Sequence, residues 1–367
     1  MMQQVVVVGG GVMGCMTALE LLQRGRHVCL IERRSTGQEA SWAGGGIVTP
    51  LYPWRYSQPI SALAEWSQSH YPALCGQLQE HTGIDPQFSE CGLIWLDHAE
   101  QDAALRWADE QRKPIVAVER EFLYQQVPVL APGFTRGMWQ AGLANVRNPR
   151  LMAALKERLL QFPGFTLREN TPVSRLKIEG DKVKGVIHAD GVQDADAVVL
   201  AAGAWTGDWL GDMGLDLPVA PVKGQMLLYK AAPGWLPSMV LHESRYAIPR
   251  RDGHILIGST LEHVGYDTTT TAQALDSLSD SAHALLPQLS GMQPVAHWAG
   301  LRPGSPDGVP FIGAVPGVDG LWLNTGHFRN GLVLAPASCR LLADLMTAAG
   351  PEIDPAPYQL QGRISPR

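Results

Sequence analysis

Near its N-terminus the chain reads Val5-Val6-Val7-Val8-Gly9-Gly10-Gly11-Val12-Met13-Gly14. The four consecutive valines predict a short β-strand that is buried on both faces. Apolar side chains at helical spacing follow from Cys15 to Leu22, and Gly25 then predicts the end of a helix. A second apolar run, residues 28–31, ends at Glu32. Strand, glycine-rich turn, helix, strand and acid thus follow in the order of a dinucleotide-binding βαβ unit.

Three glycines of this stretch fit the pattern G-x-G-x-x-G, and each has a physical role in it. Gly9 permits the tight turn, Gly11 lets a pyrophosphate approach the backbone, and Gly14 lets the helix pack close to the strand. The helix N-terminus offers free N–H groups to the phosphates. Glu32 follows at about the offset at which an acid binds ribose hydroxyls. The motif alone leaves open whether the ligand is NAD or FAD.

Length and composition favour a well-packed globular protein with two domains or one large one. The chain has 367 residues, of which 45% are hydrophobic and 17% charged, and its formal net charge is −6. Lys and Arg form no cluster, so no nucleic-acid-binding surface is expected. No apolar run approaches the length of a membrane span, and no basic signal-peptide start is present. Five cysteines without a C-x-x-C pair predict a cytoplasmic protein.

Two further segments contain small residues that point to a ligand. A second glycine cluster, residues 41–46, predicts a backbone that lies close to a flat or charged ligand, with a flexible loop as the alternative. The run from Asp196 to Trp205 predicts a buried strand that ends in Ala201-Ala202-Gly203-Ala204. That end predicts a return to the nucleotide sheet with Gly203 near the cofactor, although an ordinary buried strand would also explain the valines.

The remaining pattern predicts several helices and a second sheet. One helix is expected to begin with Asn148 as its N-cap and Pro149 in its first turn. Apolar spacing predicts other helices at residues 60–81, 102–111, 272–286 and 334–349. Residues 173–178 and 183–189 predict a hairpin. After Pro218 the composition changes, and alternating strands with turn residues between them predict an antiparallel sheet at residues 222–229, 246–250 and 255–258.

Five segments occur in an order that resembles one known family. They are the N-terminal glycine motif with Glu32, the cluster 41–46, Ala201 to Trp205, Gly300-Leu301-Arg302-Pro303 and Gly326-His327-Phe328-Arg329-Asn330-Gly331. Together they resemble the D-amino-acid-oxidase-type FAD-dependent oxidoreductases over nearly the whole chain. Within that family the chain looks most like the bacterial glycine oxidases associated with thiamine biosynthesis. Sarcosine oxidases and D-amino-acid dehydrogenases share most of these motifs.

The resemblance implies an α/β (α+β) fold in which an FAD-binding Rossmann-like βαβ domain is interleaved with an antiparallel-sheet substrate domain. It assigns residues 1–85, 145–220 and 300–367 to the FAD-binding domain and residues 86–144 and 221–299 to the substrate-binding domain. It also implies non-covalent FAD, because the nearest cysteine, Cys339, lies past the C-terminal motif on a predicted helix. The residues implied to bind FAD are Gly9, Gly11, Val12, Met13, Gly14, Glu32, Arg33, Ser41, Gly44, Gly45, Gly46, Val173, Ala202, Gly203, Trp205, His327, Phe328, Arg329, Asn330, Gly331 and Leu332.

The resemblance assigns catalysis and substrate binding to Tyr246, Arg302 and Arg329. The planar guanidinium of Arg302 suits bidentate binding of a substrate carboxylate, and a structural salt bridge is the alternative. Tyr246 is implied to add a phenolic hydrogen bond to the same carboxylate, although a core tyrosine would also fit its strand. Arg329 is expected near the flavin and the substrate, with a capping or phosphate-binding role as the alternative.

The implied reaction is FAD-dependent oxidative deamination of glycine and other small amines, such as sarcosine and small D-amino acids. Hydride would pass from Cα to flavin N5, giving an imine or glyoxylate, ammonia and, with dioxygen, hydrogen peroxide for thiamine thiazole synthesis. One alternative is a D-amino-acid or sarcosine dehydrogenase that passes electrons to a quinone or carrier. Another is a non-catalytic flavin-binding subunit. A homo-oligomer, with a tetramer as the expected size, is also implied.

No metal is expected. The histidines of the C-terminal half match no metal-ligand spacing, and neutral hydrogen-bonded rings are the better interpretation. These histidines are His242, His254, His263, His297 and His327.

Overall fold

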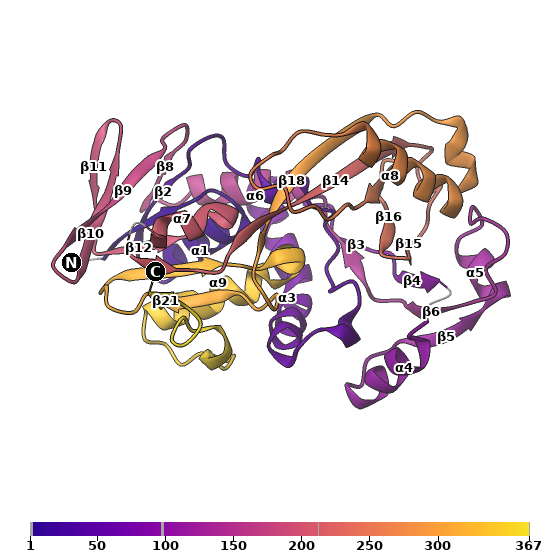
Figure 1. Ribbon diagram of the computed structural model, residues 1–367, viewed down its shortest axis with the longest axis horizontal. Helices are drawn as coiled ribbons and strands as arrows, with labels where there is room; N and C mark the ends of the chain where they lie inside the picture. Colours follow the sequence, from indigo (N-terminus) through magenta and orange to yellow (C-terminus); the bar gives the residue numbers. More distant parts are fainter. Residues whose placement is uncertain (1–2, 97–98, 212, 367) are drawn as a thin grey trace.

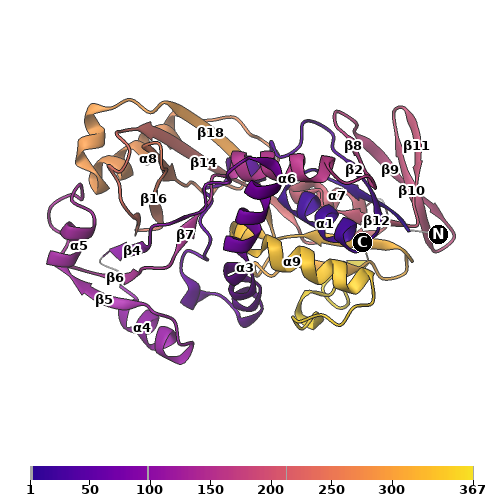
Figure 2. The same cartoon turned by 180° about the vertical axis from the view of Figure 1, so that it is seen from behind.

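The computed structural model describes residues 3–96, 99–211 and 213–366. Figures 1 and 2 show two lobes that meet at the middle of the molecule. One lobe contains the glycine-rich N-terminal unit, and both chain ends lie on it (Figure 1). The other contains the larger antiparallel sheet. The chain passes between the lobes several times, because each sheet collects strands from distant parts of the sequence.

The first lobe is built on a six-stranded sheet that is mostly parallel. Its central strands β12, β1 and β2 run in the same direction, and only the edge strand β19 runs antiparallel to its neighbour. In spatial order the strands are β19 (Phe311–Ala314), β20 (Leu321–Thr325), β12 (Ala197–Leu200), β1 (Gln4–Val8), β2 (His27–Ile31) and β8 (Phe165–Arg168).

Both faces of this sheet are buried, as the run of valines predicts. Val5 and Val7 belong to the apolar core on one side, together with side chains of four helices. Val6 and Val8 belong to a second core on the other side, which includes residues of a small antiparallel sheet. The four helices are α1 (Val12–Gln23), α3 (Gln58–Thr82), α6 (Asn148–Leu160) and α9 (Gly331–Met346). The small sheet consists of β9 (Val173–Glu179), β10 (Lys182–His188) and β11 (Gly191–Asp194).

The second lobe is built on an eight-stranded sheet. Its neighbouring strands are antiparallel except for β15 and β4, which are parallel. In spatial order the strands are β18 (Ala296–Gly304), β14 (Ala220–Lys230), β17 (His254–Gly258), β16 (Arg245–Pro249), β15 (Met239–His242), β4 (Leu93–Leu96), β6 (Arg136–Gln140) and β5 (Val116–Glu119). Its helices are α4 (Gln101–Glu110), α5 (Arg120–Gln126) and α8 (Ala272–Leu285).

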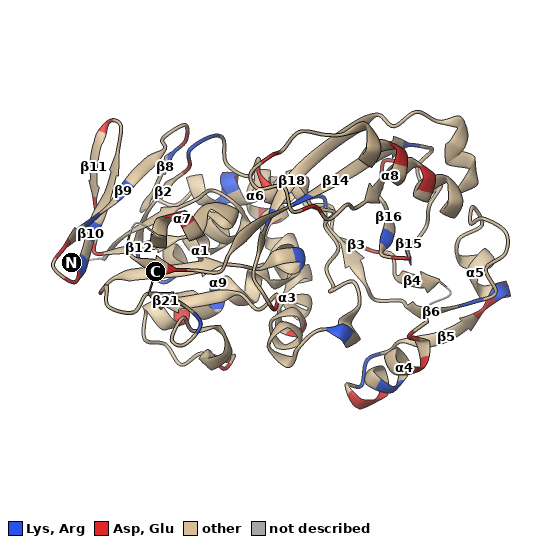
Figure 3. Ribbon diagram, viewed as in Figure 1, with Lys and Arg blue, Asp and Glu red and all other residues tan. Residues whose placement is uncertain are grey.

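Several short elements connect or flank the two large sheets, among them the 3₁₀ helices η1 (Pro53–Arg55), η2 (Gly203–Trp205), η3 (Pro287–Gly291) and η5 (Ala356–Tyr358). Two further helices are short, and two pairs of strands make small ribbons. The helices are α2 (Ala40–Ala43) and α7 (Thr206–Gly211), and the ribbons are β3 (Ser89–Glu90) with β7 (Ala144–Asn145) and β13 (Leu215–Asp216) with β21 (Ser365–Pro366). Basic and acidic residues are spread over both lobes (Figure 3). Among the described helices, none is both long and apolar enough to cross a membrane.

The observed elements confirm the expected fold class, the hairpin formed by β9 and β10, and the predicted helices to within a few residues. The N-cap prediction for Asn148 is wrong. Arg147 occupies the N-cap position of α6, and the Asn148 amide instead donates to the Ser41 carbonyl at 2.9 Å. The division at residue 300 falls inside β18, which pairs with β14 along its length. We therefore propose that the boundaries of the two domains follow the two sheets, with all of β18 in the second domain.

Candidate active site

One cavity of ≈ 410 Å³ joins the glycine-rich turn of the first lobe to the antiparallel sheet of the second. It brings together segments that lie far apart in the sequence, between Val8 and Val333. Gly14 is the one predicted site residue that does not line it, and the FAD or substrate roles of the others remain predictions. Those lining the cavity are Gly9, Gly11, Val12, Met13, Glu32, Arg33, Ser41, Gly44, Gly45, Gly46, Val173, Ala202, Gly203, Trp205, Tyr246, Arg302, His327, Phe328, Arg329, Asn330, Gly331 and Leu332.

The glycine-rich turn has no room for side chains at two positions. Gly9 has a φ of 112°, and a Cβ on it would lie 2.4 Å from the Ala201 carbonyl oxygen. A Cβ on Gly14 would lie 1.8 Å from the Gly9 carbonyl oxygen. Gly14 therefore serves the site by letting α1 approach β1, as the sequence pattern predicts, without lining the cavity.

Glu32 is fixed at the end of β2 by the backbone around it. One of its carboxylate oxygens accepts the Gly10 N–H at 2.7 Å, and the other accepts the Arg34 N–H at 2.9 Å. Each carboxylate oxygen has further acceptor capacity, which suits hydrogen bonds from ribose hydroxyls. Next to it, the Arg33 guanidinium lies 3.7 Å from the centroid of the Trp205 ring. These residues form the wall of the cavity at the expected adenosine end.

The second glycine cluster is held by an arginine that the sequence pattern did not single out. The buried guanidinium of Arg250, which follows β16, donates to the Gly45 carbonyl at 2.9 Å and to the Val146 carbonyl at 2.8 Å. Burial lowers the pKa of Arg250 to about 10. A Cβ on Gly46 would lie 2.0 Å from the same Val146 oxygen. The cluster is therefore a rigid part of the cavity wall, and the flexible-loop alternative does not hold.

The C-terminal motif passes from β20 through a short 3₁₀ turn, η4 (Phe328–Asn330), into α9. The first turn of α9, starting at Gly331, lines the cavity, so its free N–H groups lie at the cavity wall. His327 is buried, and neither of its ring nitrogens has a hydrogen-bond partner. Burial lowers the pKa of His327 to about 3, so the ring is neutral.

The cavity fits a long polar cofactor such as FAD. Buried side-chain polar atoms without a partner occur at three of its lining residues, namely Asn148 Oδ1, Asn324 Oδ1 and both ring nitrogens of His327. Buried polar atoms are nearly always hydrogen-bonded in native proteins, so these atoms indicate a bound polar ligand. The glycine-lined backbone and the start of α9 supply N–H groups for its phosphates and ring.

The antiparallel sheet presents Tyr246 and Arg302 to the cavity, and glycines on the adjacent strands make room for both. A Cβ on Gly258 would lie 2.7 Å from the Tyr246 ring, and a Cβ on Gly224 would lie 2.1 Å from the Arg302 guanidinium. The Tyr246 hydroxyl donates to the Met226 sulfur at 3.3 Å. Two side chains 56 positions apart in sequence thereby face one space.

Arg302 makes no ion pair with any carboxylate of the described residues. Its guanidinium donates to the Ser259 hydroxyl at 2.8 Å and to the Thr260 carbonyl at 3.3 Å, which are both neutral acceptors. Burial lowers the pKa of Arg302; Tyr246 opposes this effect, and the charge of Arg329 adds to it. An arginine remains protonated even so. Within the described part of the chain, Arg302 thus lacks the structural salt bridge considered as its alternative, and its guanidinium borders the cavity without a paired carboxylate.

Arg329 is exposed at the margin of the cavity. Together with Arg302 it also borders an adjoining cavity lined by Arg245 and Leu261. Arg329 therefore lies between the two cavities, and its contact with the flavin or the substrate remains a prediction. Among the described residues, no cluster of three or more His, Cys, Asp or Glu could hold a metal ion.

The sequence matches the family model for FAD dependent oxidoreductases over residues 4–345. The chain belongs to this family. It is 59% identical to the glycine oxidase of Pseudomonas aeruginosa over 364 residues, which are 99% of this chain and 100% of the relative. A crystal structure of glycine oxidase from Geobacillus kaustophilus superposes with a TM-score of 0.92 at 32% identity and covers 98% of both chains. These matches confirm FAD as the cofactor and the expected class of enzyme, an FAD-dependent amine oxidase.

The sequence pattern did not single out two residues that hold the glycine cluster of the cavity wall in place. The sequence pattern predicts Asn148 only as a helix cap and Arg250 only as the end of a strand. Their roles depend on contacts with the glycine cluster some 100 to 200 residues away, at Ser41, Gly45 and Gly46. A single polar residue at the end of a helix or strand gives no local signal that it contacts a distant segment. The spacing of apolar residues therefore could not reveal the role of Asn148 or Arg250.

Proposed function

We propose that this enzyme oxidises glycine or another small primary or secondary amine that carries a carboxylate, and passes the electrons to dioxygen. The observation that carries the proposal is the uncompensated Arg302 guanidinium facing the same cavity as Tyr246. A planar cation without a counter-ion suits bidentate binding of a carboxylate. The high identity with glycine oxidases over the full chain supports glycine as the first substrate to test.

The proposed roles follow from the positions of three side chains. Arg302 would bind the substrate carboxylate and fix its orientation, and the Tyr246 hydroxyl would donate to the same group in place of the Met226 sulfur. Arg329 would attract the anionic end of the substrate at the cavity margin. Among the cavity-lining residues contributed by the antiparallel sheet, none is a carboxylate or a histidine. This supports a reaction in which no protein base removes the Cα proton.

FAD, when bound, supplies the electron acceptor for the amine and reacts with dioxygen. The residues that would hold it are the N-terminal turn for the pyrophosphate, Glu32 for the ribose and the first turn of α9 for the flavin ring. We propose that it is held without a covalent bond. Cys339 does not line the cavity, and its buried thiol donates to the Met13 carbonyl at 3.3 Å. Burial raises the pKa of Cys339 to about 12, which also disfavours a reactive thiolate.

The product would be an imine that hydrolyses to glyoxylate and ammonia, and we propose that it serves thiamine synthesis. A relative from Trichormus variabilis, named bifunctional protein ThiO/ThiG, is 32% identical over 94% of this chain and 53% of its own length. The resemblance to glycine oxidases also supports a cytoplasmic homo-oligomer. Both statements are proposals that go beyond the family assignment.

A substrate panel tests the proposed function. We expect purified holoenzyme to consume oxygen and form hydrogen peroxide with glycine, and sarcosine, D-alanine and D-proline are compared with it. The same panel with an artificial electron-accepting dye separates an oxidase from a dehydrogenase. Dye reduction without oxygen uptake would replace the proposal with a dehydrogenase, and no reaction with any of the four amines would reject small amines as substrates.

A further inference from the structure

A loop that follows β17 in the second lobe lies along β14 of the eight-stranded sheet and contacts Arg302. After β17 the chain continues through residues 259–271 before α8 begins. The backbones of Lys223, on β14, and Glu262, in the loop, exchange two hydrogen bonds of 2.9 Å each. The Gln225 N–H donates to the Thr260 hydroxyl at 2.8 Å. The first part of the loop is thus held along β14 as an extension of the sheet.

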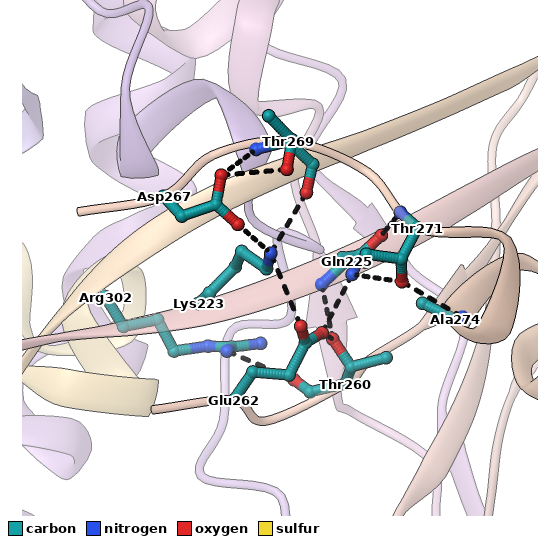
Figure 4. Close-up of polar contacts among 9 residues, drawn as sticks. All are labelled: Lys223, Gln225, Thr260, Glu262, Asp267, Thr269, Thr271, Ala274 and Arg302. Carbon is teal, nitrogen blue, oxygen red and sulfur yellow. Dashed lines mark hydrogen bonds and ion pairs between the residues drawn. The ribbon is translucent and has the colours of Figure 1, made fainter. Parts of the chain in front are cut away.

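The side chain of Lys223 anchors this loop from within. It is 1% exposed, and its ammonium contacts the Asp267 carboxylate at 2.7 Å, the Thr269 carbonyl at 3.0 Å and the Glu262 carboxylate at 3.4 Å (Figure 4). Three acceptors match the three protons of the ammonium group. Burial alone would lower the pKa of Lys223, but the hydrogen bond to Asp267 and the charges of Glu262 and Asp267 outweigh it and raise the pKa. Lys223 is therefore a charged anchor for the loop at neutral pH.

Glu262 connects this anchor to Thr260. One oxygen of the Glu262 carboxylate accepts the Thr260 hydroxyl at 2.5 Å and the Gln225 side-chain amide at 2.9 Å (Figure 4). Burial opposes ionisation of Glu262, but the hydrogen bonds from Thr260 and Gln225 and the charge of Lys223 lower its pKa. The group is thus a carboxylate at neutral pH. It fixes the orientation of the Thr260 side chain and, through it, of the loop backbone at that residue.

The same part of the loop contacts the guanidinium of Arg302. The Thr260 carbonyl and the Ser259 hydroxyl are the acceptors of its two hydrogen bonds, at 3.3 Å and 2.8 Å. Because both acceptors are neutral, they orient the guanidinium without neutralising its charge. The order of contacts in Figure 4 therefore runs from Lys223 through Glu262 and Thr260 to Arg302.

We propose that Glu262 and Thr260 are positioning residues for the substrate carboxylate. By fixing the loop at residues 259–260 they aim the Arg302 guanidinium into the cavity, an inference that rests on the proposed role of Arg302. Neither residue lines the cavity that Tyr246 and Arg302 face. The alternative is that Lys223, Glu262 and Asp267 only hold the loop on β14. In that case, removal of the Glu262 or the Asp267 carboxylate would weaken carboxylate binding to the same extent.

Titration of the holoenzyme with acetate tests this role directly. Acetate shares the carboxylate of glycine and has no amine to oxidise, and its binding is followed by the change in the visible spectrum of the bound flavin. We expect Glu262→Ala and Thr260→Val each to raise the Kd of acetate about tenfold, the loss of roughly one well-oriented charge-assisted hydrogen bond. The KM for glycine should rise in parallel, while kcat at saturating glycine stays within about twofold.

Asp267→Ala is the matched control. Asp267 lies on the same loop and contacts the same ammonium, but it makes no hydrogen bond with Thr260. We expect it to lower the melting temperature as Glu262→Ala does and to leave the Kd of acetate within about twofold of wild type. Thr260→Val replaces only a hydroxyl with a methyl group, so this variant should fold. It therefore tests the positioning role even if Glu262→Ala is too unstable to assay.

Three results would overturn the inference. The first is unchanged acetate affinity in both Glu262→Ala and Thr260→Val. The second is a loss of acetate affinity in Asp267→Ala equal to that in Glu262→Ala, which would mean that these side chains only hold the loop in place. The third is the absence of any acetate-induced spectral change in wild-type holoenzyme. That third result would also reject the proposed carboxylate site, whereas the first two would leave it standing.

Discussion

Arg302→Ala is expected to lower kcat/KM for glycine by at least about a hundredfold, because removal of one partner of a buried charge pair costs several kcal/mol. The loss should appear mainly as a higher KM if Arg302 binds the ground-state carboxylate, and also in kcat if it orients Cα for oxidation. The flavin content of the purified variant should not change, because Arg302 lies on the eight-stranded sheet and its hydrogen bonds are with Ser259 and Thr260. Steady-state kinetics with glycine measure both parameters.

Arg302→Lys is the matched control for this prediction. It keeps a positive charge but loses the planar fork, so an intermediate loss of about tenfold is expected for a bidentate contact. The carboxylate-binding role of Arg302 fails if the alanine variant keeps kcat/KM within about threefold of wild type.

Gly14→Ala is expected to yield protein that lacks stoichiometric FAD. The added Cβ would lie 1.8 Å from the Gly9 carbonyl oxygen, and that oxygen belongs to a backbone that cannot rotate away as a side chain can. Relief requires α1 to move off β1, which displaces the helix N-terminus from the pyrophosphate. Overpacking of this kind costs about 1–3 kcal/mol or more. The ratio of flavin to protein absorbance after purification, together with the melting temperature, measures the effect.

Gly76→Ala serves as the comparison for this second substitution. Gly76 lies within α3 and is exposed, and beyond its own helix no atom lies within 4 Å of the position that a Cβ would take. Alanine there should stabilise the helix by up to about 1 kcal/mol and leave flavin content unchanged. Full flavin occupancy in Gly14→Ala with an unchanged melting temperature would contradict the close packing of α1 on β1.

The nucleotide-binding unit could be predicted because its signals are local. Four valines in a row favour a strand buried on both faces, and the two cores on either side of Val5 to Val8 have that arrangement. The glycine spacing likewise depends on contacts within one turn, such as that between Gly14 and Gly9. Periodicity also placed α3, α8 and α9 to within a few residues.

The roof of the cavity could not be predicted from local signals. Tyr246 and Arg302 face one space only because β16, β17, β14 and β18 pair in a particular register, with glycines at 224 and 258 between them. The alternating pattern of a strand indicates which of its side chains share a face, but it does not indicate which distant strand lies beside it. The family resemblance, not the pattern, singled out both residues. The contacts of Lys223 with Glu262 and Asp267 likewise join a strand to a distant loop and have no local signal in the sequence.

The central claim is that FAD and an amine bound by Arg302 share one cavity. Anaerobic mixing of the holoenzyme with glycine tests it most directly, because the yellow absorbance of oxidised flavin is lost when the amine is oxidised. We expect complete bleaching of wild type, and bleaching of Arg302→Ala that is slower by at least about a hundredfold at the same low glycine concentration. Persistent yellow colour in wild-type holoenzyme, or equally fast bleaching of the two proteins, would contradict it.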